Sequence, residues 1–344
     1  MDGRDLQIDA LRGFAIILVI MGHVIAFSSF SDYQYNLLFN IIYSFHMPLF
    51  FMISGYLVFG HFKPTTIEWL KKKFMGLIIP YIIFTFVYFY VLGGFYLDRI
   101  TISGLISSLF SYTNPNSAWF LPVLFETFIV LAILINIEKF AGKKTYFLFI
   151  ALSFLAITVI DPKSISGVNQ IIYYSPFVVI GYLINEYKES AQKLIGMGVP
   201  VGSLLFPVLF SLRYTPIYNY LGQLIFLYYY ALAICGIILS YFIVKMVIKT
   251  RASSILVLSG VFSMELYLTH LVVLYYSSFF HIPLWFGPGP SEIISGTVIV
   301  FTIALALSLL LSYNKVVSTL LFGRWSYRLL KKIRPGTNKS FLES

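Results

Sequence analysis

The chain has 344 residues, of which 59% are hydrophobic and only 11% are charged. A soluble domain carries roughly 25% charged residues, so this composition excludes an ordinary soluble protein and indicates a membrane protein. The net charge of +10 could indicate a nucleic-acid partner, but the distribution of the charges along the chain has another explanation. The single cysteine, Cys235, excludes an intrachain disulfide and a CxxC metal site.

The hydrophobic runs predict ten membrane spans, since a helix needs about 20 apolar residues to cross the hydrocarbon core. The first run is long and lacks a convincing small-x-small cleavage site, so it is predicted to be a retained span rather than a signal peptide. The predicted spans cover residues 10–29, 37–60, 74–94, 118–136, 145–160, 171–186, 197–212, 220–247, 254–277 and 293–313.

The positive charges predict the orientation of these spans. If the N-terminus is cytoplasmic, all of the 24 lysines and arginines except Arg99, Lys163 and Arg213 lie on the cytoplasmic side. This bias follows the positive-inside rule, and it explains the basic surplus without nucleic acid. We therefore expect an all-α polytopic membrane helix bundle of about ten transmembrane helices, with both termini cytoplasmic.

The expected domain organisation is simple. Residues 1–334 form a single membrane domain, and residues 335–344 form a polar cytoplasmic tail that we expect to be disordered. The basic residues just before the tail are suited to contact lipid headgroups. The amphipathic external stretch 95–117 is expected to lie on the membrane surface or to fold back into the membrane.

Five ionisable side chains lie at membrane depth, away from the ends of the predicted spans. Such a group costs at least about 2.5 kcal/mol on insertion scales, so each is a functional candidate. These five residues are His23, His46, Glu126, Glu265 and His270.

His23 follows Arg12 by eleven residues in the first span. Eleven steps of 100° return to within about 20° of the starting direction, so both side chains project from one helix face, about 16 Å apart along the axis. Arg12 at the cytoplasmic mouth could bind a phosphate, and the deeper His23 could accept a proton. The pair is suited to the two ends of one long phosphorylated ligand such as coenzyme A. Alternatively, Arg12 only follows the positive-inside rule and His23 only packs between helices.

His46 enters the second span from the outer side, near Pro48 and Gly55. It either lies at a depth similar to His23 as part of the site or caps the kink at the proline. Glu126 lies about two turns inside the fourth span, with Trp119 seven residues earlier on the same face. It either belongs to the site or only bonds a neighbouring helix.

Near the ninth span, Ser263, Tyr267 and His270 are spaced at i, i+4 and i+7, which places them on one helical stripe. Glu265 points roughly the opposite way. His270 is either part of the site or a histidine solvated at the external surface.

These motifs resemble the acyltransferase-3 family of membrane proteins. The resemblance begins in "RDLQIDALRGFAIILVIMGH", which holds Arg4, Asp9, Arg12, Gly13 and His23. It continues through "FHMPLFFMISGY", "WFL" and "SMELYLTH", and so spans the first, second, fourth and ninth predicted spans in order. The family pattern is also consistent with ten spans and two cytoplasmic termini.

The resemblance implies transfer of an acyl group, usually acetyl from acetyl-CoA, to a hydroxyl of a cell-envelope glycan, with Arg12 and His23 as the central pair. Within the family, the chain looks most similar to compact sugar O-acetyltransferases without an extracytoplasmic esterase-like domain. We expect acetyl-CoA as donor, no metal, and a glycan or lipid-linked sugar as acceptor, in a bacterial plasma membrane.

The residues then take the following expected roles. His23 acts as general base or transient acyl carrier, and His46 and Glu126 orient or polarise the reacting groups. Donor-binding residues are expected to be Arg12, Asp9, Lys71, Lys72 and Lys73. Acceptor-binding or supporting residues are expected to be Trp119, Ser263, Tyr267 and His270.

Two other classes of protein remain. Ten helices, kinking prolines and buried ionisable groups also describe a transporter or exporter, although the sequence contains no detectable inverted repeat. A passive scaffold would leave the cost of five intramembrane ionisable groups unexplained.

Overall fold

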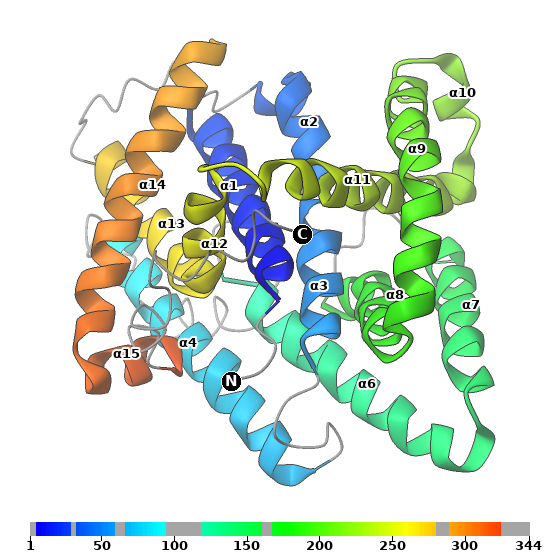
Figure 1. Cartoon of the computed structure of the whole chain (residues 1–344). Helices are drawn as coiled ribbons and strands as arrows, with labels where there is room; N and C mark the ends of the chain where they lie inside the picture. Colours follow the sequence, from blue (N-terminus) through cyan, green and yellow to red (C-terminus); the bar gives the residue numbers. More distant parts are fainter. Residues whose placement is uncertain are drawn as a thin grey trace.

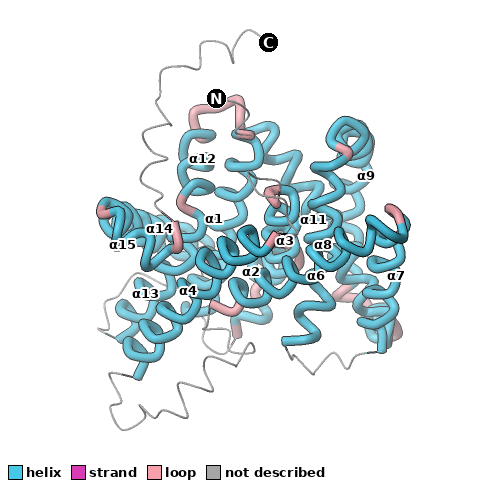
Figure 2. Tube along the Cα trace, turned by 90° about the horizontal axis from the view of Figure 1, so that it is seen from below, coloured by secondary structure: helices cyan, strands magenta, loops and turns pink. Residues whose placement is uncertain are grey.

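The computed structural model describes residues 5–28, 32–58, 66–93, 118–159, 167–279 and 289–324. Over these ranges the protein is built from helices and contains no strand (Figure 2). Eight helices are long and apolar enough to cross a membrane, and a bent pair makes a ninth candidate among the described residues. The expected all-α membrane bundle is therefore confirmed.

The α-helices run in chain order as follows: α1 (Leu6–Ser28), α2 (Leu37–Tyr43), α3 (His46–Tyr56), α4 (Ile67–Gly93), α6 (Phe120–Ala141), α7 (Lys144–Val159), α8 (Gly167–Glu186), α9 (Lys188–Leu212), α10 (Pro216–Asn219), α11 (Ile225–Val247), α12 (Ser253–Val261), α13 (Ser263–Phe279), α14 (Pro290–Tyr313) and α15 (Lys315–Phe322). Two 3₁₀ turns, η1 (Tyr33–Tyr35) and η3 (Gly222–Leu224), complete the described elements.

Each of the ten predicted spans coincides with helix, but some differ from the prediction in extent or continuity. The seventh span was expected to begin at residue 197, whereas α9 begins at Lys188, because its first two turns are polar and fall outside an apolar window. The second predicted span contains a turn between α2 and α3, and Leu37–Tyr56 still forms one candidate span as predicted. The ninth span is divided into α12 and α13, which meet at an angle of 85°.

Some predictions concern parts of the chain outside the described residues. These are the surface stretch 95–117 and the tail 335–344.

Helix α7 corresponds to the fifth predicted span. It has 16 residues and is shorter than the helices that are long enough to cross a membrane.

Helix α1 lies in the middle of the bundle (Figure 1). Helices α12, α13 and α14 lie on one side of it, and α3, α8 and α9 lie on the other. The side chains of Ala15, Ile16, Ile20, Val24 and Ile25 in α1 are completely buried. The most hydrophobic stretch of the opening motif therefore forms the centre of the protein, and its polar residues are placed among several neighbouring helices.

Two pairs of glycines let helices pass at backbone contact. A Cβ atom on Gly13 of α1 would collide with the backbone carbonyl oxygen of Leu256 in α12, and one on Gly260 of α12 would collide with that of Asp9. Gly55 of α3 and Gly181 of α8 form a second reciprocal pair of this kind. Small residues permit such close packing of membrane helices. The first pair fixes α1 against the segment α12–α13, where the candidate site lies.

Candidate active site

The side chains of Arg12 and His23 both meet α13. Arg12 donates a hydrogen bond from Nη2 to Oγ of Ser263, the first residue of α13, at 2.7 Å. The His23 ring lies beside the His270 ring, with 5.1 Å between the ring centroids. The prediction that Arg12 and His23 share one face of α1 is therefore confirmed, because one neighbouring helix contacts both.

The stripe predicted on the ninth span is also confirmed. Ser263 meets Arg12 and His270 meets His23, while Tyr267 lies between them with its ring 6.1 Å from that of His270. Glu265 points elsewhere and is completely buried against Arg324. The two oxygens of Glu265 accept hydrogen bonds from Nε and Nη2 of Arg324 at 3.2 and 2.8 Å. Glu265 therefore holds the end of α15 against α13, away from the histidines.

The Arg12 end of the site carries a second cation. Lys73 of α4 holds its Nζ 4.4 Å above the centre of the Phe128 ring and 5.5 Å from that of Trp69. The charges of Lys72 and, less strongly, of Arg12 both act on Lys73. Two cations at one end of the site favour an anionic group between them.

The other residues expected to bind the donor are placed less centrally. Lys71 and Lys72 have exposed side chains, so only Lys73 of the three lysines is packed into this part of the bundle. Asp9 is buried in α1 one turn before Arg12, at the close contact with Gly260. Roles in donor binding for these residues remain predictions.

The three histidines of the predicted spans come together at the other end of the site. His46 is near enough to His23 for the charge of one ring to act on the other. His46 holds its Nδ1 2.8 Å from the carbonyl oxygen of Ile42, and His270 holds its Nδ1 2.9 Å from that of Leu266. His46 and His270 are both buried, whereas His23 is partly exposed.

These contacts decide which nitrogen of each neutral ring carries the hydrogen. A carbonyl oxygen can only accept, so Nδ1 of His46 and of His270 must donate, and Nε2 then holds a lone pair. Nε2 of His270 is buried and has no hydrogen-bond partner among the described residues. A hydrogen-bond acceptor of fixed orientation, Nε2 of His270, therefore lies in the ring beside the partly exposed His23.

Two aromatic side chains that were not predicted from the sequence pack against predicted site residues. The Tyr43 ring packs edge-on against His46 with 4.7 Å between centroids, and Tyr174 lies 5.7 Å from the expected Trp119. Tyr43 ends α2 and His46 begins α3, so the break between the two helices, and not helical spacing, brings their rings together. Tyr174 belongs to α8, where no motif marks it, and only the fold brings it here.

Glu126 lies in α6, near enough to Tyr81 of α4 for its charge to act on the phenol. It is partly buried, and its role as an orienting or polarising group remains a prediction. Among the described residues, no group of three or more His, Cys, Asp or Glu side chains is arranged to hold a metal ion.

A model of the acyltransferase-3 family, described as an acyltransferase domain, matches residues 5–313. The chain belongs to this family. The match begins at the first described residue and includes α1 through α14, so all the candidate site residues lie within this acyltransferase domain. The suspected family is confirmed, and the protein is a multi-pass membrane member of it.

Two curated relatives are similar to about half of the chain. The nodulation protein NolL of Sinorhizobium fredii (strain NBRC 101917 / NGR234) is 28% identical over 200 residues, which are 56% of this chain and 52% of the relative. NolL of Mesorhizobium japonicum (strain LMG 29417 / CECT 9101 / MAFF 303099) is 26% identical over 189 residues, covering 54% and 49%. The chain thus spans about half the length of these relatives. No solved structure matches this chain.

Proposed function

We propose that this acyltransferase transfers an acetyl group from cytoplasmic acetyl-CoA to a hydroxyl of a cell-envelope sugar or polysaccharide, in the plasma membrane of a bacterium. The two rhizobial relatives are bacterial proteins, which supports this location. Acetyl-CoA would enter from the side at which α1 begins, and the sugar would approach from the side of the histidines.

The observation that carries the proposal is the contact of Arg12 and His23 with one helix, α13. Their separation along α1, about 16 Å at 1.5 Å per residue, suits a ligand with an anionic head and a long thin arm. Arg12 and Lys73 would hold the phosphates of acetyl-CoA, because a guanidinium and an ammonium both bind phosphate oxygens. The pantetheine arm would then place the thioester beside His23.

In the proposed reaction, His23 acts as a general base. A neutral His23 nitrogen takes the proton from the acceptor hydroxyl while its oxygen attacks the thioester carbonyl carbon. The resulting tetrahedral intermediate collapses, the carbon–sulfur bond breaks, and the departing sulfur takes the proton from the His23 imidazolium. The products are an O-acetyl ester and CoA thiol. His270 would orient His23, since its Nε2 is an acceptor of fixed position.

A second route uses His23 as a nucleophile. Its nitrogen would attack the thioester to form an acetyl-imidazole and release CoA, and the acceptor hydroxyl would then take the acetyl group. The two routes differ in their partial reactions. Only the acyl-histidine route releases CoA and leaves labelled acetyl on the protein when no acceptor is present.

The experiment uses membranes that contain the full chain, labelled acetyl-CoA and native glycan acceptors. His23→Ala is expected to lower acetyl transfer by about 10²- to 10⁴-fold, the usual contribution of a general base. Equal amounts of folded protein, measured by size-exclusion chromatography in detergent, make the comparison valid. Near wild-type transfer by His23→Ala would remove His23 from the chemistry.

A carrier of glycan or solute is the competing function, and the 85° break between α12 and α13 favours it, because transporters use discontinuous helices at their binding sites. Sealed vesicles separate the two functions. An acyltransferase moves label from acetyl-CoA to a sugar, whereas a carrier moves unmodified solute across the vesicle membrane.

A further inference from the structure

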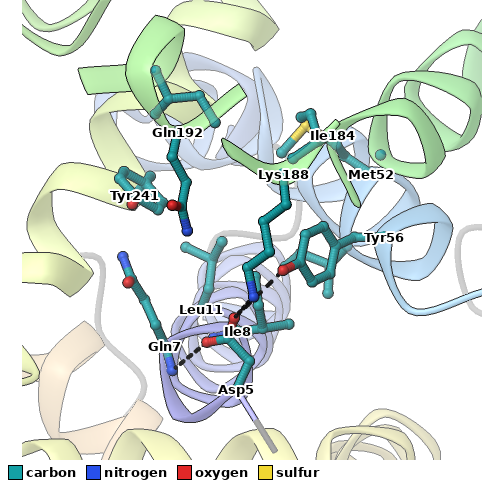
Figure 3. A pocket seen from close by; sticks show the side chains of 13 residues that line it. Asp5, Gln7, Ile8, Leu11, Met52, Tyr56, Ile184, Lys188, Gln192 and Tyr241 are labelled. Atoms are coloured by element: carbon teal, nitrogen blue, oxygen red, sulfur yellow. Dashed lines mark hydrogen bonds and ion pairs between the residues drawn. The ribbon is translucent and has the colours of Figure 1, made fainter. Parts of the chain in front are cut away.

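A pocket opens at the end of the bundle where α1 begins (Figure 3). Its walls come from the start of α1, the last turns of α3 and α8, the first turns of α9 and the last turns of α11. None of its lining residues was predicted as a site residue. Under the orientation predicted from the positive charges, this pocket faces the cytoplasm.

The charges in the pocket neutralise each other. Nζ of Lys188 lies 3.6 Å from Oδ2 of Asp5, and the Tyr56 hydroxyl donates to the same oxygen at 3.4 Å. Figure 3 shows these three side chains converging on one side of the pocket. A pocket with one cation and one anion in contact has little net charge, which disfavours a ligand that is held by charge alone.

Amide and phenol groups form the opposite side. In Figure 3 the side chains of Gln7 and Gln192 extend toward each other, and Tyr241 lies beside them. Apolar side chains, including Leu11 and Met52, line the space between the two polar sides. Polar groups that converge on an apolar pocket are typical of a site for a small organic ligand.

One of these amides lacks a partner. Nε2 of Gln7 is buried and has no hydrogen-bond partner among the described residues. A buried donor without a partner is unfavourable. A ligand that accepts a hydrogen bond from it would therefore gain more binding free energy than it would from a hydrogen bond to an exposed donor.

We propose that this pocket binds a planar, neutral, nitrogen-bearing aromatic ring, and that the ring is the adenine of the acyl donor. The second part rests on the proposed function. A glutamine amide can pair with the N6 and N7 atoms of adenine, donating to one and accepting from the other. Tyrosine rings such as Tyr241 and Tyr56 offer faces on which a base can stack. Two amides and two phenols thus match the edge and the face of such a ring.

The pocket also lies where the proposed donor needs it. Asp5 precedes Arg12 by seven residues, which is about 10 Å along the helix direction at 1.5 Å per residue. Arg12 in turn precedes His23 by about 16 Å. Measured along α1, the adenine would therefore precede the phosphates and the thioester. The donor would also pass around α1, from the side of α3, α8 and α9 to the side of α13. A phospholipid headgroup is a poorer occupant, because its phosphate would compete with Asp5 for Lys188.

The test compares two donors with the purified full chain in nanodiscs. Acetyl-CoA carries adenine, whereas S-acetyl-phosphopantetheine lacks the whole nucleotide. Gln192→Leu is expected to raise the KM for acetyl-CoA about tenfold with kcat unchanged, and to leave the kinetics with S-acetyl-phosphopantetheine unaltered. The matched control is Gln34→Leu, because Gln34 is an exposed glutamine outside the pocket. This variant should leave KM and kcat unchanged with either donor. Equal changes for both donors, or no change for either, would overturn the proposal.

A binding measurement separates this proposal from the proposed function. Adenosine 3′,5′-bisphosphate, titrated calorimetrically without any acceptor, should bind the wild type and Gln34→Leu alike and Gln192→Leu about tenfold more weakly. If the bisphosphate binds in this pattern but acetyl transfer is absent, the pocket is a nucleotide site and the proposed reaction fails. If transfer occurs but the bisphosphate does not bind, the pocket proposal fails alone. Loss of a co-purified phospholipid from Gln192→Leu, with bisphosphate binding unchanged, would assign the pocket to lipid and also overturn it.

Discussion

The segments α2–α3 and α12–α13 are both interrupted helices that carry a histidine, yet the two interruptions are stabilised differently. In α2–α3 the break falls just before His46, whose Nδ1 donates to Ile42 near the end of α2. The same carbonyl oxygen also accepts from the backbone N–H of Phe45 at 3.3 Å, so the His46 bond adds a side-chain link across the break. In α12–α13 an ion pair stabilises the break, because Arg324 binds both Glu265 of α13 and the carbonyl oxygen of Val261 at the end of α12.

The difference indicates what each histidine contributes. His270 lies two turns beyond its break and donates to Leu266 within the same helix, so its bond orients the ring rather than joining two helices. His46 therefore combines a structural bond with its place in the site, whereas His270 is held in position beside His23. A histidine at membrane depth is not by itself evidence of catalysis, and the carbonyl that it bonds helps to decide its function.

The largest effect is expected where the α12–α13 segment touches α1. Gly260→Val would drive a side chain into the backbone of Asp9 and should destabilise the protein by about 3 kcal/mol or more. Acetyl transfer should be lost with it, because Ser263 and His270 would shift relative to Arg12 and His23. Thermal unfolding in detergent measures the first effect. Gly196→Val is the control, since Gly196 of α9 has open space around it, and equal stability of the two variants would contradict the prediction.

The second largest loss of stability is expected when the positive charge that stabilises the α12–α13 break is removed. Arg324→Gln removes the ion pair between Arg324 and the buried Glu265, which should lower the free energy of unfolding by about 3 kcal/mol. The double variant Glu265→Gln/Arg324→Gln should recover most of this loss. In contrast, Lys143→Gln breaks an exposed ion pair with Glu186 and should be neutral. Chemical denaturation measures the stability of the three variants. Equal stability of Arg324→Gln and Lys143→Gln would refute the prediction.

Substitution of His270 should lower activity alone, whereas substitution of His46 should lower both activity and stability. His270→Ala should lower kcat by about 10- to 100-fold, as loss of an orienting partner does in other sites, with little change in thermal stability. His46→Ala should lower stability by about 1 kcal/mol as well as activity, because the Ile42 carbonyl at the break loses its side-chain donor. Parallel assays of transfer and unfolding test this. A His270→Ala variant that unfolds more easily than His46→Ala would reverse the assignment.

The smallest effect concerns a single hydrogen bond to α13. The Tyr88 hydroxyl of α4 donates to the Leu268 carbonyl oxygen at 2.7 Å. Tyr88→Phe should cost about 1 kcal/mol, the usual net value of one bond, while activity stays within twofold. The exposed Tyr220 provides the control as Tyr220→Phe, which should not change stability measurably. Equal unfolding midpoints for the two variants would show that α13 does not depend on this contact.

Much of the fold and part of the site followed from local patterns in the sequence. Length and hydropathy located ten helical segments, because crossing a membrane requires a run of apolar residues whatever the neighbours are. Helical periodicity placed Arg12 with His23, and Ser263 with Tyr267 and His270, because side-chain direction within a helix depends only on spacing. The polar first turns of α9 escaped the same reasoning, because an apolar window discards them.

The sequence by itself therefore determined the membrane bundle, the family, and which residues share a face of α1 or of α13. Only the tertiary structure decided that these two faces meet, that the ninth span breaks at 85°, and that Arg324 is the partner of Glu265. The same is true of the pocket between Asp5, Lys188 and Gln192, whose residues come from helices far apart in the chain. The physical reason is that helix periodicity is a local property, whereas packing between helices depends on backbone contacts, such as that of Gly13 with Leu256, between distant parts of the chain.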